Sequence, residues 1–109
     1  MVDETWTNSE KRVARVAFEG ARVAELNDLL LQFKQHAAQA KEIDEVWEIR
    51  DWLNAEQRQF ERNYDFRYSQ LIRVFGHLLA RRPIDINALQ GLSDEKIAAI
   101  KYIVEMSAP

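Results

Sequence analysis

Apolar residues recur along the N-terminal part of the chain with the period of an α-helix. Thr7 and Glu10 stand three positions apart, as in a capping box that begins a helix. The pattern then continues to about Lys41 through Val13, Ala17, Gly20 or Ala21, Ala24, Leu30 and Phe33. A helix of about 30 residues is about 45 Å long. This length exceeds the span of a compact domain of 109 residues, whose radius of gyration is about 13 Å. Part of this helix must therefore project from the domain or pack against a second chain.

Two further long helices follow the first. Asp44 is the expected cap of a second helix, which runs to about Asn63. We expect Asp65 to open a third helix that carries the apolar residues of the segment 71–79. Pro83 stops this helix at or before Arg82, because proline cannot continue a helical hydrogen-bond ladder.

The C-terminal part of the chain contains a short helical turn and one more helix. Residues 85–90 are expected to form one turn or two, closed by Gly91. Ser93 is a hydroxyl cap, and the helix that follows has its inner face at Ile97, Ile100, Ile103 and Val104. No segment alternates apolar and polar residues in the manner of a strand. The predicted fold class is therefore all-α, and the 109 residues are expected to form a single domain.

One face of the second helix carries an unusual tryptophan. At about 100° per residue, the apolar stripe of this helix consists of Val46, Ile49, Leu53, Phe60 and Tyr64. Trp47 lies roughly opposite that stripe, in an arc with Arg50, Asp51, Asn54, Arg58 and Glu61. A large aromatic side chain among charges is typical of a protein-binding hot spot. A helix bend or a dimer contact that buries Trp47 is the alternative interpretation.

Two neighbouring features are assigned structural roles. Trp52 flanks the apolar stripe and is expected in the core. The segment 64–68 concentrates aromatic residues at the junction of two helices, with Asp65 as a cap and Arg67 bound to nearby carbonyl groups.

Charge and composition exclude several classes of function. The 15 basic and 18 acidic residues are interleaved and give a net charge of −3, and neither Arg81-Arg82 nor Lys11-Arg12 makes a basic patch, which argues against nucleic-acid binding. No apolar run is long enough to cross a bilayer. The chain has no cysteine, hence no disulfide and no thiolate nucleophile. We expect a cytoplasmic protein.

The sequence offers no arrangement suited to catalysis or metal binding. His36 and His77, the two histidines, have no second ligand at metal spacing. No Ser/His/Asp set, phosphate-binding loop or acid pair in an apolar setting occurs. We therefore expect a protein that is not an enzyme and has no cofactor or metal.

Around Trp47 the sequence resembles the fluorescence recovery proteins of cyanobacteria. The residues that carry the resemblance are Ile43-Asp44-Glu45-Val46-Trp47, then Asp51-x-Leu53 and Tyr64-Asp65-x-Arg67, in the order and spacing of that family. The similarity extends from Trp6 to Ile100 without a large insertion.

The resemblance implies a homodimer with a helical stalk over about residues 7–63 and a small helical head over about 65–105. It further implies binding to the orange carotenoid protein, chiefly to its C-terminal domain, or to a related carotenoid-binding domain. Members of the family accelerate the return of that protein from the red to the orange form and so end non-photochemical quenching. Trp47 and Asp51 match the functional tryptophan and aspartate of the family, and no cofactor is implied.

The chain also differs from the family pattern. Arg50 stands where histidine is typical, and Gln57 stands where the family has a functional arginine. Arg58 is adjacent to Gln57 but points about 100° away around the helix, so it is not an equivalent substitute. In the head, Arg73 replaces an aromatic residue and Ala99 a lysine. A helical dimeric adaptor with the same scaffold and a different, non-photoprotective partner is the alternative function.

Overall fold

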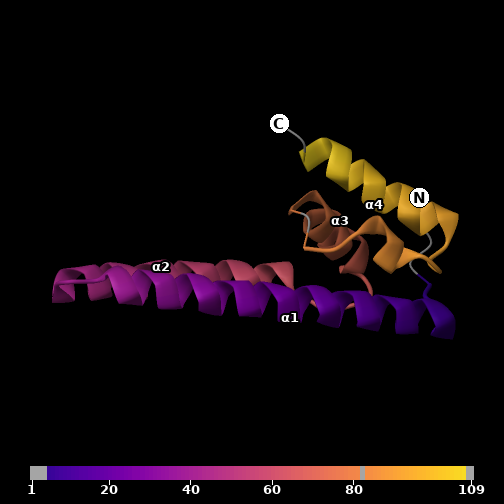
Figure 1. The fold of residues 1–109 in the computed structure, drawn as a ribbon. Helices are drawn as coiled ribbons and strands as arrows, with labels where there is room; N and C mark the ends of the chain where they lie inside the picture. The colour runs from indigo at the N-terminus through magenta and orange to yellow at the C-terminus, as the bar shows by residue number, and fades with distance from the viewer. Residues whose placement is uncertain (1–4, 82, 108–109) are drawn as a thin grey trace.

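The computed structural model describes residues 5–81 and 83–107 and is built from helices (Figure 1). Two long helices come first and three shorter ones follow: α1 (Asn8–Gln39), α2 (Ile43–Asn63), α3 (Leu71–Arg81), the 3₁₀ turn η1 (Ile86–Leu89) and α4 (Asp94–Ser107). No strand forms within these residues, so the all-α prediction is confirmed. We call α1 and α2 the hairpin, and α3, η1 and α4 the head.

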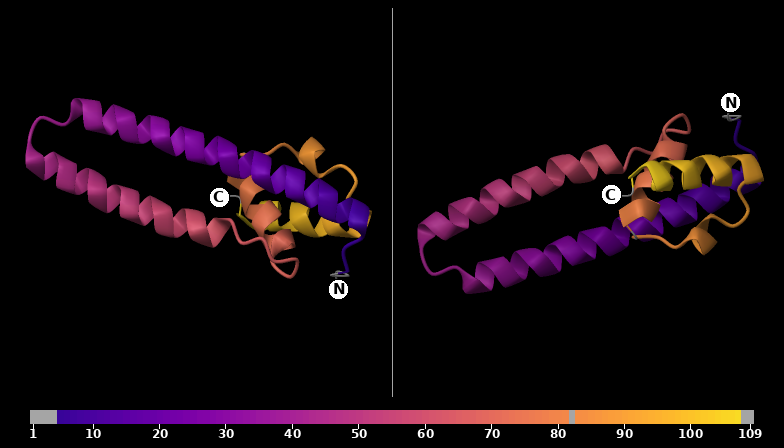
Figure 2. Two further views of the ribbon diagram at one scale, coloured as in Figure 1. Left: turned by 90° about the horizontal axis from the view of Figure 1, so that it is seen from below. Right: turned by 90° about the horizontal axis from the view of Figure 1, so that it is seen from above.

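The hairpin is antiparallel and extends well beyond the head (Figure 2). The molecule measures 53 × 28 × 21 Å and has a radius of gyration of 16.7 Å. This radius exceeds the value of about 13 Å that a compact chain of this length would have. The expectation that the first helix projects is therefore confirmed for its C-terminal part.

The signals that begin and end the helices are mostly those read from the sequence. The Thr7 hydroxyl accepts from the Glu10 amide at 3.1 Å, and the Glu10 carboxylate accepts from the Thr7 amide at 3.0 Å, which completes the capping box. Helix α3 ends at Arg81, before Pro83. Gly91 has a φ of 112°, which suits glycine after a helical turn.

Two helix starts were predicted incorrectly. Helix α2 begins after Glu42, an extended residue without a side-chain cap, so Asp44 lies in the first turn instead of capping it. Helix α3 begins at Leu71, and Asp65 does not open it. Instead the Asp65 carboxylate accepts hydrogen bonds from Arg67 Nε at 2.8 and 3.0 Å, and these bonds lower the pKa of Asp65. Arg67 is therefore bound to a carboxylate and not to carbonyl groups.

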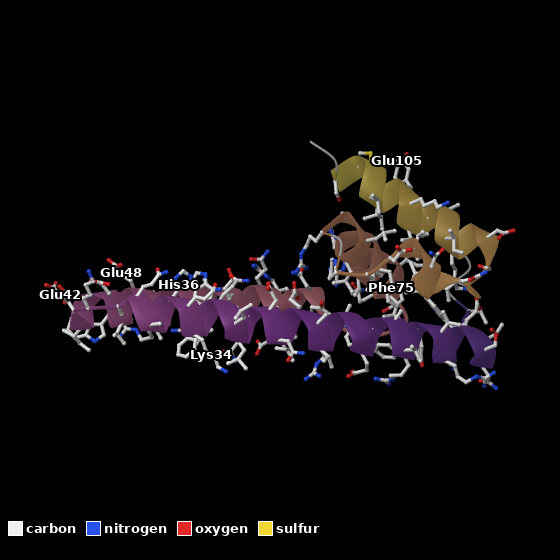
Figure 3. All side chains as sticks on the ribbon, in the orientation of Figure 1. Lys34, His36, Glu42, Glu48, Phe75 and Glu105 are labelled. Carbon is white, nitrogen blue, oxygen red and sulfur yellow. The ribbon has the colours of Figure 1, made fainter. Side chains whose placement is uncertain are left out.

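The core lies where the head meets the N-terminal half of α1. Its buried residues are Trp6, Ala14, Ala17, Phe18, Ala21, Leu71, Val74, Phe75, Leu78, Leu89, Leu92 and Ile100. Figure 3 shows Phe75 between α3 and α1. Small residues on α1 let the head approach its backbone closely, and the Tyr64 hydroxyl donates to the Ala21 carbonyl at 3.1 Å. Burial raises the pKa of Tyr64 to about 12.

The outer part of the hairpin has no comparable core. Helix α2 contains no buried residue. Trp52, expected in the core, is only half-buried and packs edge-on against His36, with 4.8 Å between ring centroids. That prediction was wrong because α1 alone covers only one side of α2, so a flanking position stays partly open to solvent.

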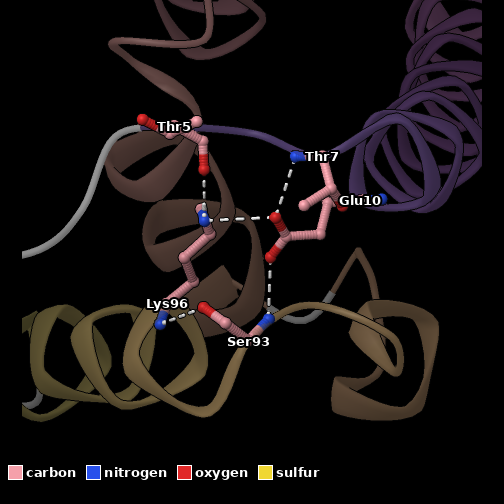
Figure 4. Close-up of polar contacts among 5 residues, drawn as sticks. All are labelled: Thr5, Thr7, Glu10, Ser93 and Lys96. Atoms are coloured by element: carbon pink, nitrogen blue, oxygen red, sulfur yellow. Dashed lines mark hydrogen bonds and ion pairs between the residues drawn. The ribbon is translucent and has the colours of Figure 1, made fainter.

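A buried ion pair joins the two ends of the chain (Figure 4). Glu10 on α1 and Lys96 on α4 are 5% and 3% exposed, and Lys96 Nζ lies 3.3 Å from Glu10 Oε1. Glu10 Oε2 accepts from the Ser93 amide at 2.9 Å, and Lys96 Nζ donates to the Thr5 carbonyl at 2.8 Å. The Ser93 hydroxyl accepts from the Lys96 amide at 3.2 Å, which confirms the predicted cap of the last helix. The two helix starts therefore form one hydrogen-bonded unit.

Gly76 fixes the distance between α3 and α4. A Cβ atom at this position would lie 2.4 Å from Ile103 Cγ2, so one of the two helices would have to move. We expect Gly76→Ala to destabilise the fold by about 1–3 kcal/mol, the usual cost of overpacking a core. Chemical denaturation followed by circular dichroism measures this change.

Gly20 provides the matched control for that substitution. It is also helical, but nothing lies within 4 Å of a Cβ atom built there. Gly20→Ala should stabilise the protein by about 0.5–1 kcal/mol, because alanine is the better helix former. Equal destabilisation by both substitutions would contradict the close approach of α3 and α4.

Candidate functional site

The five candidate binding residues lie together on the outer face of α2. Trp47 is 52% exposed, a high fraction for the largest apolar side chain. The others are also exposed, and the helical period places all five within an arc of about 100°: Trp47, Arg50, Asp51, Asn54 and Arg58. We call this surface the Trp47 face. Its apolar centre and polar surroundings are the composition of a protein-binding surface.

The charges of the Trp47 face are available to a partner. Arg50 Nε donates to Asp51 Oδ1 at 3.1 Å, and the two side chains are 62% and 69% exposed. An exposed pair of this kind contributes little to stability, about 0–1 kcal/mol. Among the residues that the structure describes, Arg58 has no carboxylate partner. Both Asp51 and Arg58 can therefore replace their contacts with water by contacts with polar groups of another protein.

Two more apolar residues lie at the same end of α2. Ile43 is 59% exposed and Val46 is 45% exposed, although the sequence pattern assigned Val46 to an inward stripe. The pattern identifies that stripe correctly as apolar but does not reveal how much of it α1 covers. The free end of the hairpin, where Figure 3 places Glu42 and Glu48, therefore combines exposed apolar side chains with acids.

Within residues 5–81 and 83–107, no group of three His, Asp or Glu side chains is placed to hold a metal ion. In that same part of the chain, no helix is long and apolar enough to span a membrane.

Comparison with known proteins identifies the family. Residues 6–104 match the family model described as photoprotection regulator fluorescence recovery protein. The fluorescence recovery protein of Synechocystis sp. is 31% identical to this chain over 101 residues, which is 93% of each protein. The chain belongs to the fluorescence recovery protein family.

Solved fluorescence recovery proteins have the same fold. The structure from Fremyella diplosiphon superposes with a TM-score of 0.90 at 29% identity, covering 94% of this chain and 100% of that one. The structure from Synechocystis sp. gives a TM-score of 0.88 at 31% identity, covering 93% and 99%. The family consists of regulators of photoprotection and not of enzymes.

The four residues that were expected, by the resemblance, to differ from the family pattern fall in two places. Arg50 lies on the Trp47 face, and Gln57 is an exposed neighbour whose amide donates to Glu61 at 3.5 Å. Arg73 and Ala99 are in the head, on α3 and α4. Arg73 Nε donates to Gln70 Oε1 at 3.0 Å, and Ala99 is partly buried.

Proposed function

We propose that this protein binds the orange carotenoid protein through the Trp47 face and accelerates its return from the red to the orange form. The observation that carries the proposal is the exposed tryptophan of α2, which by the resemblance of the Trp47 segment corresponds to the functional tryptophan of the family. Asp51 lies four residues further on the same face, and by the same resemblance it corresponds to the functional aspartate. Membership in a family of photoprotection regulators supports this partner.

The mechanism requires no chemistry by the protein itself. A binding protein shifts a two-state partner only if it prefers one of the two states. We infer that the Trp47 face binds the C-terminal domain of the carotenoid protein and favours a closing, resting-like arrangement of the carotenoid domains. Accelerated recovery then ends non-photochemical quenching.

We also propose that the active form is a homodimer joined along the hairpin. Along one side of α1, apolar residues recur first after seven residues and then with the alternating three- and four-residue spacing of a helix–helix seam: Val16, Val23, Leu26, Leu30, Phe33, Ala37 and Ala40. Val16, Val23 and Leu30 are 74%, 49% and 51% exposed. An apolar row of this length on a single chain indicates a partner helix, and the homodimer implied by the family supplies one.

Recovery kinetics test the proposed function. Mixed with photoactivated orange carotenoid protein, the wild type should accelerate the red-to-orange absorbance change. Trp47→Ala should reduce that acceleration by about tenfold or more, since truncating a hot-spot aromatic costs at least about 2 kcal/mol. Asp51→Leu should act in the same direction, and both variants should keep their helix content.

Lys101→Ala is the control for these substitutions, because Lys101 is an exposed side chain of the head, on a different helix from Trp47. It should leave recovery unchanged. An active wild type with unimpaired Trp47→Ala and Asp51→Leu variants would contradict the role of the Trp47 face.

Arg50 and Gln57 favour a second candidate function. By the resemblance they stand where the family has a histidine and an arginine, so the surroundings of Trp47 differ and the same scaffold can serve as an adaptor for a different protein. A folded wild type with no effect on recovery would favour this adaptor function.

A further inference from the structure

Four basic residues gather where α1 passes the segment that joins α2 to α3. They come from two parts of the chain far apart in sequence: Lys11, Arg15 and Arg22 from α1, and Arg67 from the connecting segment. We call this surface the basic junction. Two carboxylates are nearby, and each pairs with one of the four: Glu19 with Arg22 at 3.6 Å and Asp65 with Arg67. The positive charges of Lys11 and Arg15 are not offset in this way.

Aromatic rings hold these two cations in place. The guanidinium of Arg15 lies 3.9 Å from the centroid of the Phe66 ring, and Lys11 Nζ lies 5.1 Å from the centroid of Tyr68. A ring face attracts a cation without neutralising its charge or accepting its in-plane N–H groups. Within the described chain, neither side chain forms an ion pair with a carboxylate. Arg15 is therefore exposed and lies beside a ring that leaves its charge unneutralised.

The rings themselves are fixed by the core. Phe66 packs on Phe18 with centroids 4.9 Å apart and on Tyr68 at 5.6 Å. Tyr68 in turn packs on Trp6 at 5.9 Å. A binding surface whose side chains are already ordered loses less conformational entropy when a ligand arrives. This rigidity distinguishes the basic junction from the scattered charges of α2.

We propose that the basic junction is a docking surface for an acidic segment of a partner protein. A planar guanidinium stacked on a ring offers two parallel N–H groups, which match a carboxylate. Nucleic acid fits less well, because single strands bind by stacking bases on open ring faces, and here Arg15 and Lys11 lie over the Phe66 and Tyr68 rings. The net charge of −3 also disfavours a polyanion as long as DNA.

The basic junction is separate from the Trp47 face. Tyr64 stands seventeen positions after Trp47, a rise of about 25 Å along a helix. Substitutions at one surface therefore leave the other intact, and failure of the carotenoid-protein assignment would not remove this proposal.

Fluorescence anisotropy with a labelled peptide of alternating glutamate and serine tests the proposal. The wild type should bind this peptide at low salt, and Arg15→Gln should weaken binding about tenfold, the loss of one charge-assisted contact. Arg15→Lys should weaken it several-fold, because it keeps the charge but loses the planar pair of donors. Lys11→Gln combined with Arg15→Gln should abolish binding.

A charge-matched variant tests whether peptide binding depends on the basic junction or on the overall charge of the protein. Lys34→Gln combined with Lys101→Gln removes two positive charges elsewhere, and Figure 3 places Lys34 on the side of α1 away from the head. Peptide binding should survive in this variant, and circular dichroism should match in all variants. Equal weakening by the two double variants would overturn the proposal. Tighter binding of duplex DNA than of the peptide would also overturn it. So would a change in oligomeric mass on Arg15→Gln, because the basic junction would then bind a second copy of this chain.

Discussion

Glu10→Gln is expected to destabilise the protein by about 3–5 kcal/mol, the usual cost of removing one partner from a buried ion pair. Glu10 accepts hydrogen bonds from the amides of Thr7 and Ser93 and from Lys96 Nζ. A glutamine has one acceptor oxygen in place of two, so its NH₂ group must face one of these donors. Lys96 is 3% exposed, and its ammonium group would keep the Thr5 carbonyl and the Trp6 ring without a carboxylate to balance its charge. Urea denaturation at neutral pH measures the loss.

The stability that Glu10 contributes is expected to fall as the pH is lowered. Burial opposes ionisation of Glu10, but the hydrogen bonds from Thr7, Ser93 and Lys96 outweigh it and hold the pKa below its ordinary value of 4.5. A carboxyl group with a lowered pKa stabilises the fold above that ordinary value and loses this contribution as the pH falls through the folded-state pKa. The stability difference between wild type and Glu10→Gln should therefore shrink on acidification. A difference that stays constant below pH 4.5 would contradict the ion pair.

A double variant controls for loss of packing. Lys96→Met keeps a side chain of similar length without a charge, and Glu10→Gln/Lys96→Met leaves no buried charge at this position. It should be more stable than Glu10→Gln alone, because the unpaired ammonium is then absent. If the two substitutions were simply additive, the contact between Glu10 and Lys96 would carry no coupling energy.

The helix boundaries set by local chemistry could be predicted from the sequence. Thr7, Pro83 and Ser93 act within three residues of where they stand, so a short stretch of sequence contains the whole cause. The start of α3 was misplaced because Asp65, which resembles a cap, pairs instead with Arg67 two residues away. A cap and an ion pair compete for the same carboxylate, and the sequence does not decide between them.

Contacts between distant segments could not be predicted. Glu10 was recognised as part of a capping box, but nothing in the sequence connects it with Ser93 and Lys96, more than eighty positions away. The basic junction was missed for the same reason, since Arg15 and Phe66 meet only in the folded chain. Lys11 and Arg12 had been considered as neighbours in sequence, where they make no patch.

The helical period predicted the exposure of the Trp47 face but overestimated burial on the opposite stripe. An apolar stripe is fully buried only where another layer covers it, and the hairpin has one layer over most of its length. Val46 is consequently 45% exposed and Trp52 half-buried.

Leu30→Glu is expected to separate the proposed homodimer into monomers. Leu30 is 51% exposed and lies in the middle of the apolar row on α1. In a symmetric dimer the substitution occurs twice, so a cost of about 2 kcal/mol per copy gives about 4 kcal/mol and weakens the dimer roughly a thousandfold. Light scattering should give about twice 12.8 kDa for the wild type and a value near 12.8 kDa for the variant.

Gln35→Glu is the matched control, because it adds the same charge at an exposed polar position on another side of α1. It should remain dimeric, and both variants should keep the helix content of the wild type, since the head core does not involve either residue. A wild type that is monomeric at micromolar concentration would contradict the proposed seam, as would a Leu30→Glu variant of unchanged mass. Dissociation by both substitutions would mean that the added charge, and not the apolar row, decides the association.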